Sequence, residues 1–129
     1  MNVPEDLKYT REHEWVLVEG KIATVGITDY AQSELGDIVY LEFPAVGDRV
    51  RLSESAGTIE AVKTVADLFA PLSGEVLEVN ETLPEEPERV NRDPYGEGWM
   101  FKLSIEDPSE LEELLGAADY KRLVEESRR

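Results

Sequence analysis

The chain has no cysteine, and His13 is its only histidine. The missing thiols exclude disulfides, thiolate nucleophiles and thiolate metal sites, and a His-rich zinc site cannot be assembled from one imidazole. Because His13 lies between two glutamates, we interpret it as a surface or packing residue and not as the base of a catalytic triad. A Walker-type phosphate loop and an EF-hand loop are missing too, and residues 96–98 (G-E-G) lack the third glycine of a dinucleotide-binding loop. The sequence therefore argues against a self-contained enzyme.

Basic residues are scarce as well, since 13 Lys and Arg stand against 29 Asp and Glu, a formal net charge of −16. Nucleic acids and anionic membranes are bound through basic patches, so the sequence predicts neither as a partner. The charge is compatible with steering towards basic protein partners or with solubility alone. No apolar run has the length of a membrane span, and residues 1–8 have no apolar signal core. We expect a cytoplasmic protein of a bacterium or an archaeon.

The sequence does contain enough apolar residues, 41% of 129, for a single soluble domain spanning residues 1–129. Short apolar or alternating segments separated by turn residues are typical of β-strands. They predict a mainly β fold with strands at residues 14–18, 21–27, 37–43, 49–52, 57–62, 65–70, 74–81 and 99–105. In the segment 74–81 we expect Val76, Leu77 and Val79 to be partly buried. Residues 82–98, with three prolines and an acidic run at 85–88, are predicted to form a solvated loop.

Two regions carry helix signals. Thr28 or Asp29 can cap a short internal helix, which Gly36 can end in a left-handed conformation. The carboxyl-terminal helical segment, 107–126, begins with D-P-S-E, which resembles a capping box with proline at the first helical position. Gly116 is expected to end the first helix of this segment, whose apolar face consists of Leu111, Leu114 and Leu115. We predict that the segment packs on the β core.

Lys63 has the most distinctive surroundings in the chain. It lies between two strand-like segments, 57–62 and 65–70, and is predicted to sit on the turn of a hairpin. Its neighbours Val62, Thr64 and Val65 are β-branched and would stiffen that turn. A ligase can acylate an exposed amine on a rigid hairpin, and the modified side chain would become a long arm that moves a reactive group between active sites.

Seven short motifs run nearly from one end of the chain to the other. They are YTREHEWV (9–16), VGITDYAQ (25–32), LGDIVYLEFP (35–44), EAVKT (60–64), APLSGEV (70–76), VNRDPYGEGW (90–99) and LLGAADY (114–120). In this order and spacing they resemble the H proteins of the glycine cleavage system, a family of the lipoyl/biotinyl-carrier superfamily. A bare lipoyl domain would match only the core hairpin at 57–76.

The resemblance implies a flattened lipoyl/biotinyl-type β-barrel (a barrel-sandwich hybrid) with a short internal helix and carboxyl-terminal helices. It implies covalent attachment of lipoate to Lys63, which would occupy a hairpin tip. Glu60, three residues before the lysine, and Gly74, eleven residues after it, match the family's lipoylation-recognition residues. A lipoate ligase or lipoyl transferase is the implied modifying partner.

The implied function is that of a carrier shared by three enzymes. The oxidised arm would accept an aminomethyl group from glycine as glycine decarboxylase (P protein) releases carbon dioxide. The aminomethyltransferase (T protein) would take the group from the arm, and dihydrolipoyl dehydrogenase (L protein) would reoxidise the dithiol. The chain itself would be a non-catalytic carrier protein, the lipoylated substrate of these enzymes.

In the family the loaded arm can fold back into a surface cleft. Glu14 and Asp67 correspond to acidic residues there, where each carboxylate would make a charge-assisted hydrogen bond to the amine of the arm. The alternative is that both are ordinary surface acids. Two positions depart from the family pattern: Ala61 replaces a common serine, which we expect to leave lipoylation intact, and Glu12 replaces a small polar residue, which leaves the details of the cleft open.

Three other functions stay open at this point. A biotin carrier shares the fold, but biotin ligases favour methionines beside the lysine, and Lys63 has Val62 and Thr64 instead. An H-like lipoyl relay protein of lipoate metabolism would use the same lysine, so the sequence does not separate it from the carrier. The third alternative is a structural β-domain without modification.

Overall fold

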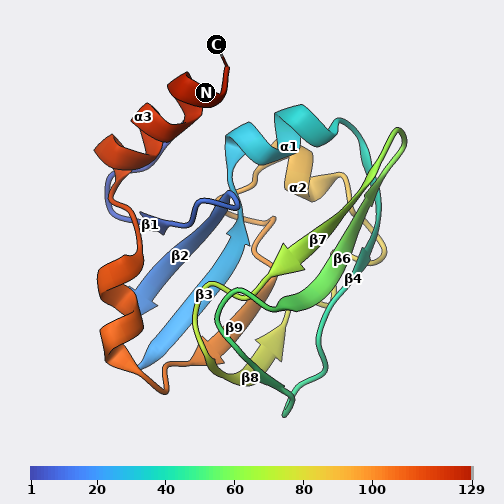
Figure 1. Cartoon of the computed structure of the whole chain (residues 1–129). Coiled ribbons are helices and arrows are strands. Elements are labelled where there is room, and N and C mark those ends of the chain that lie inside the picture. Colours follow the sequence, from blue (N-terminus) through green and yellow to red (C-terminus); the bar gives the residue numbers. More distant parts are fainter. Residues whose placement is uncertain (129) are drawn as a thin grey trace.

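Antiparallel strands build two sheets in the computed structural model, which describes residues 1–128 (Figure 1). The six-stranded sheet has the order β1-β2-β3-β9-β8-β5, and the three-stranded sheet has the order β4-β6-β7. The strands are β1 Lys8–Tyr9, β2 Glu14–Glu19, β3 Ile22–Ile27, β4 Ile38–Glu42, β5 Arg49–Val50, β6 Ser55–Ala61, β7 Val65–Phe69, β8 Gly74–Val79 and β9 Phe101–Ser104. The predicted mainly β fold is confirmed.

All predicted strands are present, with ends that differ by up to a few residues. β1 was not predicted, because its two residues carry no periodic pattern. The turn between β2 and β3 lies one residue later than expected. Glu19 pairs with Ile22, so Gly20 and Lys21 form the turn.

The core lies between the two sheets. Alternate residues of a strand point to the same face, so each sheet turns one set of apolar side chains inward, including Val16, Val25, Leu41, Ile59, Leu68, Phe101 and Leu103. Alternation in β8 buries Val76 and leaves Leu77 41% exposed. A register shift between Val76 and Glu78 interrupts the alternation, and Val79 is half-buried. The expected burial of Leu77 is therefore wrong. A second apolar cluster around Tyr9, Trp15 and Tyr120 joins the carboxyl-terminal helix to the sheet.

The internal helix α1 Asp29–Leu35 forms as predicted. The hydroxyl of Thr28 caps it by accepting a hydrogen bond from the Ala31 amide (3.2 Å). Gly36 ends it with φ 79°, a left-handed value that a glycine adopts without a steric penalty. The chain can therefore turn sharply from α1 into β4, where it runs beside the hairpin of β6 and β7.

The carboxyl-terminal segment begins as a 3-10 helix, η1 Pro108–Glu113. Asp107 caps it by accepting a hydrogen bond from the Ser109 amide (3.0 Å), as predicted. The prediction that the Glu110 side chain completes a capping box is wrong. The Glu110 carboxylate accepts hydrogen bonds from the amide (2.7 Å) and the hydroxyl (2.8 Å) of Ser73, so a tertiary contact replaces the local one.

Gly116 does not end that helix, contrary to the prediction, but precedes the next one, α3 Ala117–Ser127. The helix is interrupted because Leu115 pairs with Tyr9 in an isolated β-bridge, with backbone N–O distances of 2.7 and 2.8 Å. Leu111 and Leu114 pack on the main core, so the predicted packing of segment 107–126 is confirmed. Within residues 1–128, no helix has both the length and the apolar character needed to cross a lipid bilayer.

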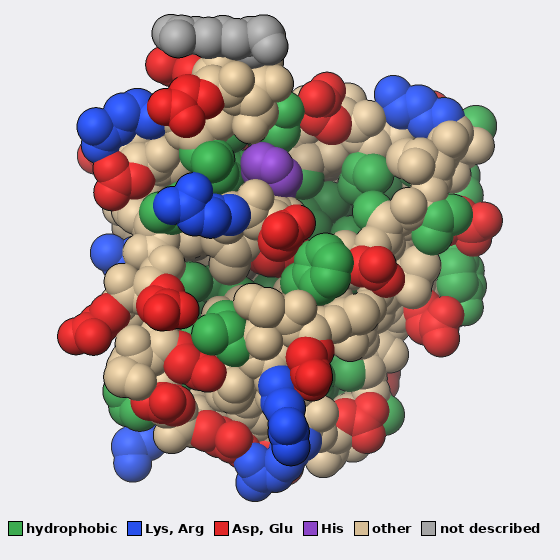
Figure 2. Space-filling view, viewed as in Figure 1, with side chains coloured by type: hydrophobic (Ala, Val, Ile, Leu, Met, Phe, Trp, Pro, Cys, Tyr) green, Lys and Arg blue, Asp and Glu red, His purple; other side chains and the backbone are tan. Residues whose placement is uncertain are grey.

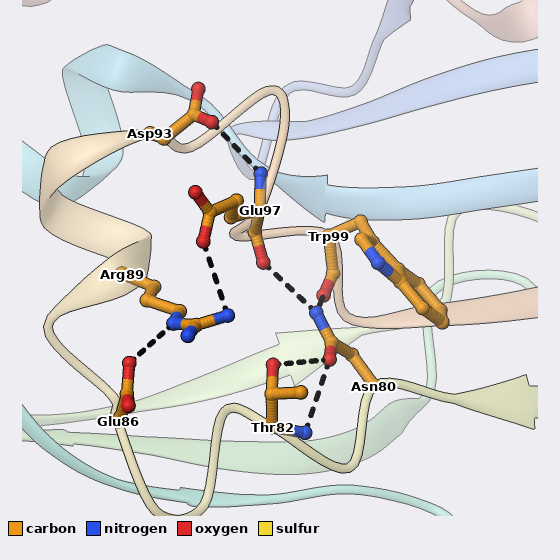
Figure 3. A network of polar contacts seen from close by, with 7 residues as sticks. All are labelled: Asn80, Thr82, Glu86, Arg89, Asp93, Glu97 and Trp99. Atoms are coloured by element: carbon orange, nitrogen blue, oxygen red, sulfur yellow. Dashed lines mark hydrogen bonds and ion pairs between the residues drawn. The ribbon is translucent and has the colours of Figure 1, made fainter.

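Residues 80–99 are more ordered than the predicted loop and contain a short helix, α2 Arg89–Arg92. The Asn80 side chain donates to two backbone carbonyls (2.8 and 2.9 Å) and accepts from the Thr82 hydroxyl (2.7 Å) (Figure 3). Arg89 makes ion pairs with Glu86 (2.5 Å) and Glu97 (3.1 Å). The acidic run at 85–88 is thus only in part a solvated loop.

Candidate functional site

Lys63 lies at the tip of the hairpin formed by β6 and β7 (Figure 1). Glu60 pairs with Val65, and the Ala61 amide donates a hydrogen bond to the Thr64 carbonyl (2.8 Å). Only Val62 and Lys63 are left to form the turn, and both side chains are exposed. The predicted hairpin and the position of Lys63 at its tip are therefore confirmed.

The hairpin tip is tied to the chain between α1 and β4. The Val62 amide donates a hydrogen bond to the Asp37 carbonyl (3.0 Å). The lysine side chain extends past Gly36, where a β-carbon would come within 3.4 Å of Lys63 Cε. The lysine of the tip is thus placed beside the carboxyl end of α1.

Asn91, at the centre of α2, holds that connecting chain in place. Its side-chain oxygen accepts a hydrogen bond from the Ile38 amide (3.0 Å). Its nitrogen donates to the Gly36 carbonyl (2.8 Å) and to the Gln32 side chain (3.0 Å). A neutral amide supplies both the donor and the acceptor that this arrangement needs. Sequence reasoning did not single out Asn91, although it lies in the matched motif at 90–99.

A cleft of about 280 Å³ opens between α1, the adjoining ends of β2 and β3, and the hairpin. Figure 2 shows this hollow beside the single histidine, with hydrophobic side chains inside it and acidic side chains around it. The lining residues are Glu12, His13, Glu14, Ile27, Tyr30, Ala31, Glu34, Leu35, Ile59, Ala66 and Asp67. The fold therefore brings Glu14 and Asp67, which lie 53 positions apart in the sequence, to one cleft.

Glu14 is buried, with 2% of its surface exposed, and is not a surface acid. Its carboxylate accepts a hydrogen bond from the Thr10 hydroxyl (2.6 Å). Burial raises the pKa of Glu14 to about 7, although hydrogen bonds from the Thr10 hydroxyl and the Phe69 amide act in the opposite direction. Near neutral pH this carboxyl group can therefore exchange between its neutral and charged forms.

Asp67 differs from Glu14, because its side chain is exposed at the edge of the cleft. It accepts one hydrogen bond, from the Ser55 hydroxyl (3.2 Å). Glu12 and Glu34 also line the cleft, and none of the lining residues is a lysine or an arginine. A lining that combines four acidic residues with apolar ones favours a ligand with an apolar body and a positively charged end.

His13 lines the cleft and contacts residues of the protein interior behind it. Its backbone has a left-handed φ of 72°, and its Nδ1 lies 2.8 Å from the Tyr120 hydroxyl. That hydroxyl also contacts the Thr28 hydroxyl (2.7 Å), and the Thr28 amide donates to the His13 carbonyl (3.0 Å). Burial lowers the pKa of His13. These contacts agree with its interpretation as a packing residue, and they link α3 to the helix cap of α1.

The structure does not bring Gly74 to the cleft or to the hairpin tip. It is buried at the start of β8, where a β-carbon would lie 1.8 Å from the Ser104 carbonyl oxygen. A close approach of two backbones thus explains why this position needs glycine. Glu60, by contrast, is exposed on the hairpin near its tip. Recognition of either residue by a ligase stays a prediction.

Sequence reasoning missed the apolar floor of the cleft, which consists of Ile27, Ala31, Leu35, Ile59 and Ala66. A signal for part of it exists, since Ala31 and Leu35 are four residues apart and share one face of α1. The other members come from separate strands. Within residues 1–128 no group of His, Asp and Glu side chains is arranged to hold a metal ion.

Two small antiparallel sheets, with an exposed lysine on the hairpin that ends one of them, define a carrier domain of the lipoyl/biotinyl type. The family model for the glycine cleavage H-protein matches residues 7–127. The chain therefore belongs to the glycine cleavage H-protein family.

Individual relatives agree with this assignment. The chain is 60% identical over 124 residues to the glycine cleavage system H protein of Bacteroides thetaiotaomicron, covering 96% of this chain and 98% of that protein. It is 56% identical to the H protein of Carboxydothermus hydrogenoformans, covering 96% and 95% of the two chains. The crystal structure of a glycine cleavage system H protein from Mycobacterium marinum matches with a TM-score of 0.83 at 37% identity, covering 93% of this chain and 97% of that chain. The expected family and fold class are both confirmed.

Proposed function

We propose that Lys63 carries lipoate in amide linkage and that this arm performs the carrier function of the glycine cleavage system. The observation that carries the proposal is the position of the lysine. It is exposed on a two-residue turn, tied by the Val62–Asp37 hydrogen bond, and placed beside the end of the helix that lines the cleft. An amine in this position is open to a modifying enzyme, and an arm that starts there lies close to the cleft.

Attachment needs the uncharged amine of Lys63. Its Nζ forms a bond to the carbonyl carbon of an activated lipoyl group, the bond from that carbon to the leaving group breaks, and Nζ loses a proton. When bound, lipoate supplies a disulfide that can take up an aminomethyl group and be regenerated from the dithiol. The protein contributes the position of the amine and the surface around it.

The lining of the cleft supports the proposal that the loaded arm binds there. The apolar floor would pack against the hydrocarbon chain, and Glu14 and Asp67 would hold the protonated amine at its end. Ion pairing with the buried Glu14 is stronger than with an exposed acid, because less water competes for the charge. Enclosure of the amine in this way would also protect the aminomethyl group from hydrolysis.

The chain acts as a carrier, and we propose that it catalyses none of the steps itself. Its partners in the glycine cleavage system would be glycine decarboxylase, the aminomethyltransferase and dihydrolipoyl dehydrogenase, each acting on the far end of the arm. A lipoate ligase or lipoyl transferase would act on Lys63, with Glu60 among the residues that it contacts. We also propose a cytoplasmic location.

Intact mass spectrometry tests the attachment. Incubation with a bacterial lipoate ligase, lipoate and ATP should add one lipoyl group to the protein and none to the Lys63→Arg variant. Lys102→Arg, which changes a lysine outside the hairpin, should still gain one group. A lipoyl group on the Lys63→Arg variant would show that the site is wrong.

A second measurement separates the glycine cleavage carrier from a lipoyl relay protein. The lipoylated protein, mixed with glycine decarboxylase, should support exchange of labelled carbon dioxide into glycine. The Lys63→Arg variant gives the background. If lipoylated protein gave no exchange above that background, the relay function would be favoured.

A further inference from the structure

Large apolar side chains on the surface are concentrated around Lys63. In the part of the chain that the structure describes, the exposed large apolar residues are Met1, Ile22, Val39, Tyr40, Val46, Val62, Val65 and Leu77. Half of them, Val39, Tyr40, Val62 and Val65, lie on the hairpin end that carries the lysine or on the strand beside it. We call these four residues the tip patch. Such clustering needs an explanation, because single exposed apolar residues are ordinary and contiguous ones are not.

Strand register places two members of the tip patch, Tyr40 and Val65, in one row on either side of Glu60. Tyr40 pairs with Glu60, and Glu60 pairs with Val65, so these three side chains share the outer face of the three-stranded sheet. A β-bulge between Ile38 and Tyr40 interrupts the alternation of β4. As a result both Val39 and Tyr40 are 50% exposed, where regular alternation would have buried one of them.

Acidic residues border the tip patch. Glu60 lies inside it. In the next row of outward-facing residues on the same sheet, Thr58 lies between Glu42 and Asp67. Asp37 is exposed beside the turn, where its carbonyl binds the Val62 amide. A partner that covers this face would match it with an apolar centre and basic side chains around that centre.

We propose that the tip patch is the docking surface for the enzyme that acylates Lys63. This inference rests on the proposed lipoylation of that lysine. The acylating enzyme must place the activated carbonyl carbon within bonding distance of Nζ, so it has to cover the residues that flank the lysine. Enzymes that act on the finished arm react at its far end. The lysine side chain and the lipoyl chain separate that end from the tip patch.

The step that the docking serves is an acyl transfer. The lysine Nζ forms a bond to the acyl carbon, the bond from that carbon to the phosphate oxygen of the adenylate breaks, and AMP leaves with the electron pair. The proton from Nζ goes to solvent or to a base of the enzyme. The tip patch takes no part in the chemistry, so its loss should weaken binding and leave the chemical step unchanged.

A pair of double variants tests the proposal. Tyr40→Ser with Val65→Ser removes the two apolar side chains that flank Glu60, and Val46→Ser with Leu77→Ser is the matched control on another surface. Val65 and Val46 are both 61% exposed, while Tyr40 and Leu77 are 50% and 41% exposed. Initial rates of lipoylation by a bacterial lipoate ligase, measured by intact mass over a range of protein concentrations, give KM and kcat. We expect KM to rise about tenfold for the tip-patch variant, as for loss of an aromatic anchor, and kcat to stay unchanged. The control should behave like the unchanged protein.

A second pair guards against loss of folding in the double variant. Val65→Thr and Val46→Thr keep the β-branched shape and replace one methyl group by a hydroxyl. We expect Val65→Thr to raise KM about threefold, the effect of roughly one buried methyl group, and Val46→Thr to leave it unchanged. Equal KM values for both threonine variants and the unchanged protein would overturn the proposal.

The exchange reaction with glycine decarboxylase tests the choice of partner. The Tyr40→Ser/Val65→Ser protein, lipoylated to completion by long incubation, should support exchange at the rate of the lipoylated unchanged protein. A loss of exchange equal to the loss of lipoylation would assign the tip patch to a later enzyme or to several enzymes, against the proposal. Failure of the unchanged protein to accept lipoate would instead overturn the proposed function itself, without any variant.

Discussion

The two walls of the cleft are held in place by different kinds of contact. The wall formed by α1 and the ends of β2 and β3, which we call the helix wall, has two hydrogen bonds behind it. The bond between His13 and Tyr120 is partly buried, and the bond between Tyr120 and Thr28 is buried. The wall formed by the hairpin, which we call the hairpin wall, is exposed on its outer face. Its acid, Asp67, has one surface hydrogen bond, from Ser55.

This difference shows how one small domain can both hold a ligand and display a side chain. The helix wall carries the buried Glu14, whose position is fixed by its neighbours. The hairpin wall carries Lys63 and the tip patch, which must be accessible. The Val62–Asp37 hydrogen bond holds its tip, and hydrogen bonds of Ala70 with Ser53 and Glu54 (2.8 and 2.9 Å) close its base. Beyond the base the chain enters β8 at the closely packed Gly74.

The largest effect should come from Gly74, beyond the base of the hairpin wall. In Gly74→Ala the new β-carbon would meet the Ser104 carbonyl at 1.8 Å, so one of the two backbones has to move. We expect the free energy of unfolding to fall by more than about 3 kcal/mol, measured by urea denaturation. Gly116→Ala is the control, because its β-carbon would have no neighbour within 4 Å. If both variants lost the same stability, the close packing of Gly74 against Ser104 would not limit this position to glycine.

A pH-dependent effect should come from the helix wall. The pKa of Glu14 is raised by burial to about 7, whereas its value in the unfolded chain is near 4.5. Between these pH values the folded protein keeps a proton that the unfolded chain has lost, so this group lowers stability as pH rises and has no further effect above about pH 7. The total is roughly 3.5 kcal/mol, at about 1.4 kcal/mol per pKa unit. Glu14→Gln should lack this part of the pH profile.

The control for that experiment is Glu12→Gln, which changes an exposed carboxylate two residues away. Its stability profile should keep the slope that Glu14 causes, at slightly lower pH, because the Glu12 charge makes the smallest of the contributions to the raised pKa of Glu14. A Glu14→Gln profile with the same slope as the control would mean that the pKa of Glu14 is the same in the folded protein as in the unfolded chain.

The smallest effects should come from removing one hydroxyl group behind each of the two walls. Tyr120→Phe keeps the ring stacked on Tyr9, at 4.6 Å between centroids, but removes the hydroxyl that bridges His13 and Thr28. Unsatisfied partners in a buried site should cost about 1–3 kcal/mol of unfolding free energy. Ser55→Ala, which removes the bond to Asp67, should stay within about 0.5 kcal/mol. Similar losses in both variants would erase the distinction between the walls.

Local sequence patterns predicted most of the fold. Alternation and turn residues located the strands, Thr28 and Gly36 located both ends of α1, and the apolar segments around Lys63 predicted its hairpin. These features depend on neighbours within a few positions, so the sequence contains their cause. Only the family resemblance pointed to Glu14 and Asp67, because alternation in β2 gives no hint that Glu14, Trp15 and Val16 are all buried.

Features that depend on distant partners could not be predicted in this way. Glu110 left its expected capping position for Ser73, 37 residues away, and Gly116 lost its helix-ending role because Leu115 pairs with Tyr9. α2 has only four residues and no side-chain cap, so it has no local signature. The cleft itself exists only where segments from four parts of the chain meet.

Asn91 has a consequence for the thermodynamics of modification. By fixing Gly36 and Ile38 it fixes the carbonyl that binds the Val62 amide, so the backbone of the turn is ordered before any enzyme arrives. The conformational entropy of that segment is lost when the chain folds and not when a complex forms. Only the lysine side chain remains to be immobilised in the encounter, which makes the hairpin tip a preorganised substrate.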